Sequence, residues 1–441
     1  MRAAFSTIIR RFAYDKGGNI AVIFALSCVP LISAVGCAID YSRATQTRSK
    51  LQAAADAASV GSIAKASPAF KAAGTMTGDG TIAVGVTDAQ NIFNANRANL
   101  TGYSLTGLTS TVVKSGSTVT STVTFNAQIN TMFLGLIGKS ALTMNGTSKA
   151  TASMPLYIDF HLLLDNSPSM GVGATPTDVD KMVKNTSDKC AFACHDLKDK
   201  NNYYDLAKKL GVTTRIDVLR TATQSLMDTA SATQTYSNQF RMAIYDFGGS
   251  ASTLGLRSLF SLSASLSSAK TAAGNIDLMT VNGQNENNDQ DTPFTAVFPA
   301  IDKQISSPGP GTSASPLKYL FFVSDGVADE NNTGCLKPRS GTTRCQSPIN
   351  PALCKSMKDR GVKIAVLYTT YLALPTNDWY MKWIAPFNAG PYGPSPNSQI
   401  AQNMESCASP GLYFEVSPTQ GIADAMNALF KKAVADARLA S

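Results

Sequence analysis

The sequence predicts an α/β protein with an N-terminal transmembrane helix, a small α+β spacer and a C-terminal doubly wound domain with insertions. Three observations predict this fold class. An uncharged apolar run lies near the start of the chain, at Asn19–Ile39. Residues 66–154 are rich in Thr, Ser, Gly and Asn and contain short alternating runs. From residue 155 onward, apolar runs of strand length alternate with stretches of helical spacing.

The composition allows a sizeable core and argues against two classes of function. The chain has 441 residues, 44% hydrophobic and 15% charged, which is enough for two or three folded domains. Its formal net charge of +8 is not gathered in a long Lys/Arg run, so we expect no nucleic-acid partner. The sequence has two His and no Walker or Rossmann phosphate loop, so we do not expect an enzyme.

The start of the chain has the features of a membrane anchor. Residues 1–18 form a basic leader with four Lys or Arg and one Asp. As a helix, the apolar run is about 30 Å long, which is enough to cross a bilayer and exceeds the core of a cleaved signal peptide. The positive leader predicts a cytoplasmic N-terminus. We expect a transmembrane helix at 19–41 and an Ala-rich membrane-proximal helix at 42–65.

Periodicity predicts the elements that follow. In the spacer, 66–154, strands are expected at 110–113, 118–125 and 141–144, and a helix at 88–98. In the C-terminal domain, 155–441, strands are expected at 156–164, 240–247, 318–324, 362–368 and 411–416, and helices include 215–231 and 419–438. Two insertions, near 171–214 and 327–350, follow strand ends, where ligands bind in open α/β sheets. We expect them to form the rim that selects a partner.

A cluster of oxygen ligands is the strongest functional signal. Asp165-Asn166-Ser167-Pro168-Ser169 follows the first apolar strand and places a carboxylate and two hydroxyls at alternate positions. Thr292 precedes an amphipathic helix, and Asp325 follows another buried strand. Hard divalent cations prefer oxygen ligands. The sequence therefore predicts a cation site at one edge of the sheet.

This pattern, Asp-x-Ser-x-Ser followed by a Thr and a strand-end Asp-Gly, resembles the metal-ion-dependent adhesion site of von Willebrand factor A (VWA) domains. The resemblance implies a VWA domain in which the hydroxyls bind the metal directly, the two Asp bind it directly or through water, and an acidic group of a partner completes the shell. Asp291 departs from the family pattern, where many relatives have Gly, and either adds negative charge near the ion or faces solvent. The implied ligands of Mg²⁺, Mn²⁺ or Ca²⁺ are Asp165, Ser167, Ser169, Thr292 and Asp325.

The N-terminal segment carries a second resemblance. A basic leader, Gly18-Asn19, the apolar span, Asp40-Tyr41 and the LQAAADAA run at Leu51–Ala58 are similar to the start of TadG-like proteins of Flp/Tad pilus assembly. This resemblance implies a single-pass protein of the bacterial inner membrane with its bulk in the periplasm. Type IV prepilins carry Glu five residues after the cleaved Gly, where this chain has Ile23. A retained anchor is therefore expected.

Six of the eight Cys lie in the C-terminal domain, and an even number clustered in loops fits an oxidising compartment. Sequence alone does not choose the pairing. Loop proximity suggests Cys190–Cys194, Cys335–Cys345 and Cys354–Cys407.

Three functions remain open. The first is a membrane-anchored periplasmic protein of Flp/Tad pilus assembly that binds a pilus or secretion-system protein, or another envelope component, through its cation. The second is an envelope scaffold with a vestigial metal site. The third is a c-type haem protein, because Cys190, Cys194 and His195 have one residue more between the Cys than the haem attachment motif.

Overall fold

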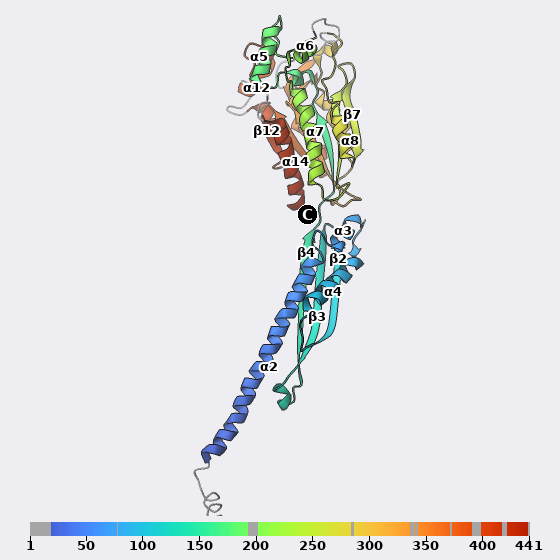
Figure 1. The fold of residues 1–441 in the computed structure, drawn as a ribbon. Helices are drawn as coiled ribbons and strands as arrows, with labels where there is room; N and C mark the ends of the chain where they lie inside the picture. Colours follow the sequence, from blue (N-terminus) through green and yellow to red (C-terminus); the bar gives the residue numbers. More distant parts are fainter. Residues whose placement is uncertain are drawn as a thin grey trace, which may run out of the picture. The chain divides into compact units, whose positions relative to one another are not determined.

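The computed structural model describes residues 19–76, 78–192, 202–283, 286–335, 339, 343–370, 373–389, 398–416 and 421–439. The chain divides into two compact units, Met1–Met154 and Pro155–Ser441. Each unit has its own sheet, and the two are described separately (Figure 1).

The first unit is built on one long helix. Helix α2 (Asn19–Gly61) runs without a break through the expected membrane span and the expected membrane-proximal helix, with Pro30 inside it. From Val22 onward it contains an 18-residue window with a mean hydropathy of 2.4, of which 6% is buried. By length and composition, α2 is therefore able to cross a membrane.

The Ala-rich half of α2 packs against an antiparallel sheet with the order β1-β2-β3-β4. Leu51, Ala55 and Ala58 are fully buried, and the hydroxyls of Ser62 and Ser121 lie 2.9 Å apart. Small side chains thus let the helix approach the sheet closely. The other elements of this unit are α3 (Pro68–Thr75), β1 (Gly80–Thr81), α4 (Ala83–Arg97), β2 (Ser104–Ser115), β3 (Thr118–Asn130), η2 (Leu134–Ile137) and β4 (Ala141–Ser153).

The strands of this sheet are longer than the alternating runs in the sequence indicated. β3 and β4 pair over their full lengths of 13 residues, although their ends are mostly Thr, Ser and Asn. In β3 the alternation continues past residue 125, because Ala127 and Ile129 are buried on the same face. β4 has one buried residue, Met144, so its remaining length depends on pairing with β3 rather than on burial.

The second unit contains a six-stranded sheet with the order β12-β11-β8-β5-β6-β7. All its strands are parallel except β7, which pairs antiparallel with β6. Numbered along the chain, this order is the doubly wound one, so the predicted fold class is confirmed. The strands are β5 (Ile158–Leu164), β6 (Phe240–Gly248), β7 (Leu254–Ser263), β8 (Leu317–Ser324), β11 (Lys363–Thr369) and β12 (Tyr413–Val416).

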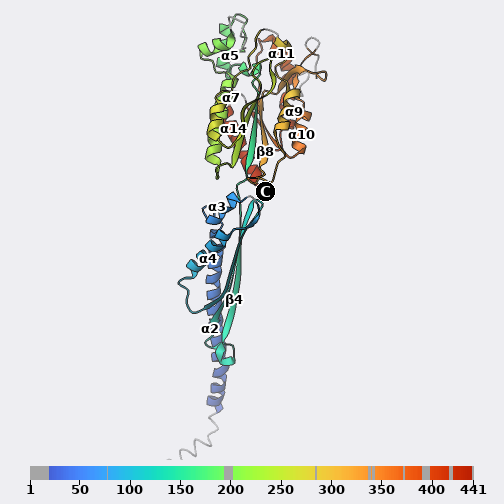
Figure 2. The same ribbon diagram turned by 90° about the vertical axis from the view of Figure 1, so that its right-hand side faces the viewer.

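Helices cover both faces of this sheet (Figure 2). On one face Phe160 of β5 packs against Phe430, with ring centroids 5.0 Å apart. On the other, Phe322 of β8 packs against Phe294 at 5.7 Å. The first face carries α7 (Arg215–Thr233), α8 (Leu266–Ala273) and α14 (Ile422–Leu439), and the second carries α9 (Phe294–Gln304), α10 (Lys355–Asp359) and α13 (Gln399–Cys407).

The two insertions form structures of their own at the carboxyl ends of the strands. The first contains helices and the second an antiparallel hairpin. The elements outside the layers are η3 (Pro168–Gly171), α5 (Pro176–Asn185), α6 (Tyr203–Leu210), η4 (Glu286–Asp289), β9 (Val327–Asn331), β10 (Arg344–Pro348), η5 (Pro351–Cys354), α11 (Asp378–Trp383) and α12 (Ala385–Ala389).

Two of the three suggested disulfides are present. Cys335–Cys345 closes the hairpin of the second insertion, and Cys354–Cys407 joins η5 to α13. Cys194 and His195 lie outside the described residues, so both the third pairing and the haem motif stay predictions.

The sequence did not predict β7, and its surroundings explain why. Its side chains are mostly half-buried, without the alternation of a strand that has one buried face. It is also an edge strand, held by the ion pair between Arg257 Nε and Asp246 Oδ1 at 2.9 Å. Partial burial and a long-range ion pair leave no periodic signal in the sequence.

His161 lies within β5 and is buried in the unit, with 2% of its surface exposed. Its ring stacks on Tyr245, with centroids 6.1 Å apart. Burial lowers the pKa of His161 to about 4, against the nearby charge of Asp159, which raises it. The unfolded chain therefore binds a proton more readily than the folded one between pH 6.5 and 4.

We predict that His161→Phe makes the second unit less sensitive to acid. The depressed pKa destabilises the wild-type fold as the pH falls below 6.5, by about 2–3 kcal/mol at pH 4.5, and Phe removes this loss. Urea unfolding of the full chain in detergent, followed by the fluorescence of Trp379 and Trp383, measures the effect. Identical pH dependence in the two proteins would contradict it.

Candidate functional site

The candidate site lies where β5 and β8 end. These strands are parallel neighbours with Leu164 opposite Val323, so the residues that follow them reach the same edge of the sheet. The backbone N–H of Asp165 donates to the carbonyl of Val323 at 2.9 Å. Asp165 and Asp325 are both fully buried. The strand register therefore brings these two Asp together.

The carboxylate of Asp165 gathers hydroxyl groups around it. Its Oδ1 accepts hydrogen bonds from the backbone N–H of Ser167 at 2.9 Å and from the hydroxyl of Ser167 at 2.6 Å. The hydroxyls of Ser167 and Ser169 lie 2.9 Å apart. Ser324 donates to the other carboxylate oxygen, Oδ2, at 2.6 Å. Three of the five predicted ligands are thus joined by hydrogen bonds, together with Ser324, which the sequence did not single out.

The surroundings of Asp165 favour its neutral form over its charged form. Burial and the neighbouring charge of Asp325 raise the pKa of Asp165 to about 7, against the hydrogen bonds from Ser167 and Ser324, which lower it. Two carboxylates this close in a dry environment disfavour each other's charged form, and a nearby positive charge favours it.

Arg215 brings a positive charge to Asp325. Its Nη1 lies 3.7 Å from Asp325 Oδ2, and both side chains are fully buried. Its Nη2 donates to the carbonyl of Thr370 at 2.7 Å. Arg215 is the first residue of α7, where the helix dipole disfavours a cation. Interactions with the sheet edge therefore outweigh the dipole here. No sequence signal distinguishes this Arg from others at helix starts.

Gly326 follows Asp325 in a conformation that favours glycine. Its φ is +77°, and a Cβ built on it would lie 2.8 Å from Cγ of Met404 and 2.9 Å from Cγ2 of Ile400. The chain turns sharply here and leaves Asp325 at the strand end.

Thr292 is held by a different strand from the Asp165 cluster. Its N–H donates to the carbonyl of Asp329 at 3.0 Å, and the N–H of Asp329 donates back at 3.2 Å. Asp329 lies on β9, four residues beyond Asp325. Thr292 is therefore fixed to the β9–β10 hairpin of the second insertion, which we call the rim hairpin. Among the described residues, no hydrogen bond joins Thr292 to Asp165 or Ser167.

The sequence left two expectations for Asp291: that it adds negative charge near the ion, or that it faces solvent. The second expectation is wrong, because Asp291 is buried. It is 6% exposed, and burial, with the charges of Asp329 and Asp289, raises its pKa to about 7, while Arg344 lowers it. Asp291 therefore adds a buried acidic group beside Thr292.

Asn166, in the middle of the first motif, joins its own loop to the end of β6 and to the segment that contains Met279. Its side-chain amide donates to the carbonyl of Gly248 at 2.8 Å, and its side-chain oxygen accepts from the N–H of Phe247 at 3.1 Å. Its backbone carbonyl accepts from the N–H of Met279 at 2.9 Å. Asn166 therefore positions the motif. In the sequence, the one signal of this role is that Asn166 lies between the predicted ligands Asp165 and Ser167.

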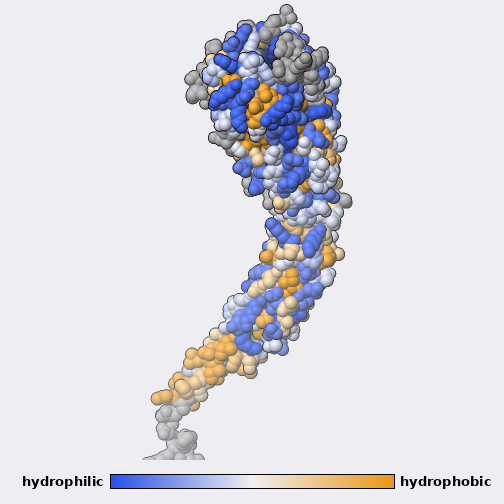
Figure 3. Space-filling view, turned by 45° about the horizontal axis from the view of Figure 1, so that its top comes forward, coloured by the Kyte–Doolittle hydropathy of each residue, from blue (hydrophilic) through white to orange (hydrophobic). Residues whose placement is uncertain are grey.

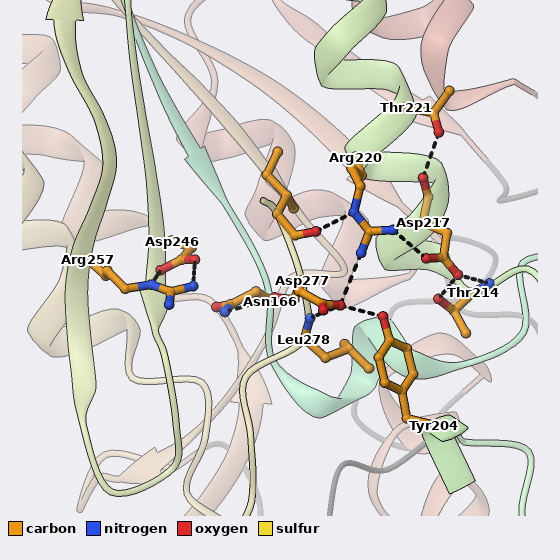
Figure 4. Close-up of polar contacts among 11 residues, drawn as sticks. Asn166, Tyr204, Thr214, Asp217, Arg220, Thr221, Asp246, Arg257, Asp277 and Leu278 are labelled. Atoms are coloured by element: carbon orange, nitrogen blue, oxygen red, sulfur yellow. Dashed lines mark hydrogen bonds and ion pairs between the residues drawn. The ribbon is translucent and has the colours of Figure 1, made fainter. Parts of the chain in front are cut away.

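A polar network lies beside this loop (Figure 4). Arg220 Nη1 donates to Asp217 at 2.7 Å, and its Nη2 donates to Asp277 at 3.1 Å. The hydroxyl of Tyr204 also donates to Asp277. The carbonyl of Asp277 lies 3.4 Å from the Asn166 amide. The first insertion, which contributes Tyr204, is thereby connected to the Asp165–Ser169 loop.

The described part of the chain contains no group of three or more His, Cys, Asp or Glu side chains that could hold a metal ion. Three of the five predicted ligands are hydroxyls. Such a donor set suits Mg²⁺ or Ca²⁺ rather than zinc.

Comparison with protein families identifies the N-terminal segment. Residues 18–62 match the model of the Tad family, described as Flp pilus-assembly TadE/G-like. The segment is TadE/G-like. The resemblance predicted from Gly18-Asn19, the apolar span and the Ala-rich run is therefore confirmed over residues 18–62, while residues 1–17 of the basic leader lie outside the match. No curated protein matches the chain.

Several solved structures are similar to parts of the chain. The pilus adhesin SpaC from Lactobacillus rhamnosus GG is 14% identical, with a TM-score of 0.37, and the match covers 76% of this chain and 34% of SpaC. The vWF domain of the type V pili tip protein Mfa5 from Porphyromonas gingivalis is 9% identical, with a TM-score of 0.36 and coverage of 64% and 97%. The PilB minor pilin from Streptococcus sanguinis is 11% identical, with a TM-score of 0.35 and coverage of 76% and 78%. The fold of the second unit is assigned from the order of its own strands.

We predict that Ser324→Ala destabilises the second unit. The hydroxyl of Ser324 donates to Asp165 Oδ2 and accepts from the N–H of Gly326 at 2.9 Å. Removing it leaves two buried polar groups without this partner, which costs about 1–3 kcal/mol. Urea unfolding of the full chain measures the change. Ser258→Ala, on an exposed position of β7, is the control, and equal effects of the two substitutions would contradict the prediction.

Proposed function

We propose that the chain is a membrane-anchored protein of Flp/Tad pilus assembly whose second unit binds a partner through a divalent cation. Mg²⁺, Mn²⁺ or Ca²⁺ would be held by Asp165, Ser167, Ser169, Thr292 and Asp325. The protein would act by recognition rather than catalysis.

The observation that carries this proposal is the gathering of hydroxyls and carboxylates at the ends of β5 and β8. The hydroxyl of Ser167 lies within hydrogen-bond distance of both Asp165 and Ser169, and Asp325 is close enough to raise the pKa of Asp165. The donor set fits a hard cation, because all its atoms are oxygen. A bound cation would also relieve the repulsion between two buried carboxylates.

The chemistry of the donors suggests the class of partner. Five protein oxygens leave at least one coordination position open on a hard divalent ion, which takes about six oxygen ligands or more, and a carboxylate oxygen of a partner can fill it. We therefore propose a carboxylate of a pilus or secretion-system protein, or of another envelope component, as the bound group. The insertions that contain α5, α6 and the β9–β10 hairpin lie at this edge and would select the partner.

The proposed location follows from α2 and the TadE/G-like segment. The apolar helix has the length to cross a bilayer, and the basic leader, residues 1–18, favours a cytoplasmic N-terminus. We propose the bacterial inner membrane, with the second unit in the periplasm. An oxidising periplasm suits the two disulfides.

Arg215 favours a second candidate, an envelope scaffold with a vestigial metal site. Its guanidinium lies 3.7 Å from Asp325 in the dry interior and supplies part of the positive charge that a metal would bring. In this alternative the ion pair replaces the cation. The two candidates differ in whether metal binding stabilises the protein.

We predict that Mg²⁺ or Mn²⁺ stabilises the second unit and that Asp165→Ala removes the effect. A ligand that binds only the folded state at about 100 times its Kd raises the free energy of unfolding by about 2.7 kcal/mol. Thermal and urea unfolding of the full chain in detergent, with metal and with chelator, measure the shift.

The control for this titration is Asp228→Ala. Asp228 is an exposed residue of α7 whose partner is Lys270, at 2.7 Å. Its removal is expected to leave the metal shift intact, because exposed ion pairs contribute little to stability. A wild-type protein that shows no shift, or an Asp165→Ala variant that keeps it, would favour the scaffold.

A further inference from the structure

The tip of the β3–β4 hairpin is fixed to α2 at the end of the apolar span. Both carboxylate oxygens of Asp40 accept backbone hydrogen bonds from this tip. The donors are the N–H groups of Met132 at 3.0 Å, Phe133 at 2.8 Å and Leu134 at 2.8 Å. Asp40 is 2% exposed, and Figures 1 and 2 both place the hairpin tip beside α2. One side chain of the helix thus saturates three consecutive amides.

The tip also packs on α2 within the apolar run itself. A Cβ built on Gly36 would lie 2.4 Å from Cγ of Phe133, so the ring sits directly on the helix backbone. Gly36 precedes Ile39, the last residue of the apolar run, by three residues, or about 5 Å along the helix axis. If α2 crosses a membrane over this run, Phe133 lies at the depth of Gly36, within the apolar part of the bilayer rather than at its edge.

The outer side of the tip is apolar and exposed. Met132 is 67% exposed, Leu136 83% and Ile137 65%, and none of the three is covered by the described part of the chain. Large apolar side chains this close together mark an interaction surface. On α2, Val35 and Ile39 are exposed as well. Lys139 follows the tip, where a long cationic side chain can reach toward lipid headgroups.

We propose that the tip, Met132–Ile137, inserts into the bilayer beside α2, so that the first unit is anchored at two points. The occupant is lipid because the exposed apolar side chains of the tip lie beside the apolar run of α2, on which Phe133 packs at Gly36, and that run is hydrophobic over its described surface in Figure 3. Asp40 holds the tip at this depth. A helix alone can rotate and tilt in a bilayer, whereas a second insertion fixes which side of α2 carries the sheet. This inference rests on the proposed membrane anchoring.

Quenching by brominated lipid tests the insertion. The full chain is reconstituted in phosphatidylcholine vesicles with brominated acyl chains, with Trp379→Phe and Trp383→Phe removing the native fluorophores. Single Trp residues are then placed by Leu136→Trp at the tip, Val35→Trp in the apolar span, and Val84→Trp at an exposed position of α4. Circular dichroism checks that the helix content is kept.

We predict strong quenching at the tip and in the span, by roughly half relative to unbrominated lipid, and little at α4, because bromine quenches only within the acyl region. Quenching at Val35→Trp without quenching at Leu136→Trp would overturn the inference and leave the anchor standing. Such a result with blue-shifted emission at Leu136→Trp would assign the tip to a contact with a second copy of the chain, because no other protein is present. Absence of quenching at both positions would overturn the anchor and the inference together.

A further substitution tests the role of Asp40. Asp40→Asn leaves one acceptor oxygen where there were two, so the three amides lose part of their anchorage. We expect weaker quenching at Leu136→Trp in this background and unchanged quenching at Val35→Trp. Equal quenching with Asp and Asn at this position would show that Phe133 and the apolar surface hold the tip without the carboxylate.

Discussion

The parallel pairing of β5 with β8 is the constraint on which the site depends. It sets Leu164 opposite Val323, so that Asp165, one residue after Leu164, and Asp325, two residues after Val323, are both buried at the same edge of the sheet. Two such groups cannot both carry a charge in a dry place without compensation. The chain itself stabilises these charges, with hydrogen bonds from the hydroxyls of Ser167 and Ser324 to Asp165 and with the guanidinium of Arg215 beside Asp325. In the proposed function, a bound cation would stabilise them further.

The sequence predicted the elements that have a hydrophobic periodicity. It did not predict the elements that are held by long-range contacts. Apolar runs predicted β5, β6, β8, β11 and β12, and charge-free length predicted the span of α2. The edge strand β7 and the rim hairpin β9–β10 carry no such period, because an ion pair, a disulfide and strand pairing hold them. These contacts join residues whose proximity only the folded chain reveals.

The same division applies to the site. Asp165, Ser167 and Ser169 lie in one loop, so their spacing alone brought them together. Thr292 is placed by its pairing with Asp329, which no spacing reveals. Ser324 is adjacent in sequence to the predicted ligand Asp325. Its hydrogen bond to Asp165, however, depends on the pairing of β8 with β5. Arg215 reaches the site from a helix start, where the dipole disfavours a cation, and that position concealed it.

Three buried Asp show how the kind of donor decides what a carboxylate can do. Asp40 accepts from three backbone amides, which are fixed by the chain and leave it a structural role. Asp159 is paired with the cations of Arg241 and Lys318, which neutralise it in the core. Asp165 accepts mostly from hydroxyls, which can turn and offer their lone pairs to an ion. Among these three, only Asp165 keeps neighbours able to become ligands themselves, which is why cation binding is proposed at its end of the sheet.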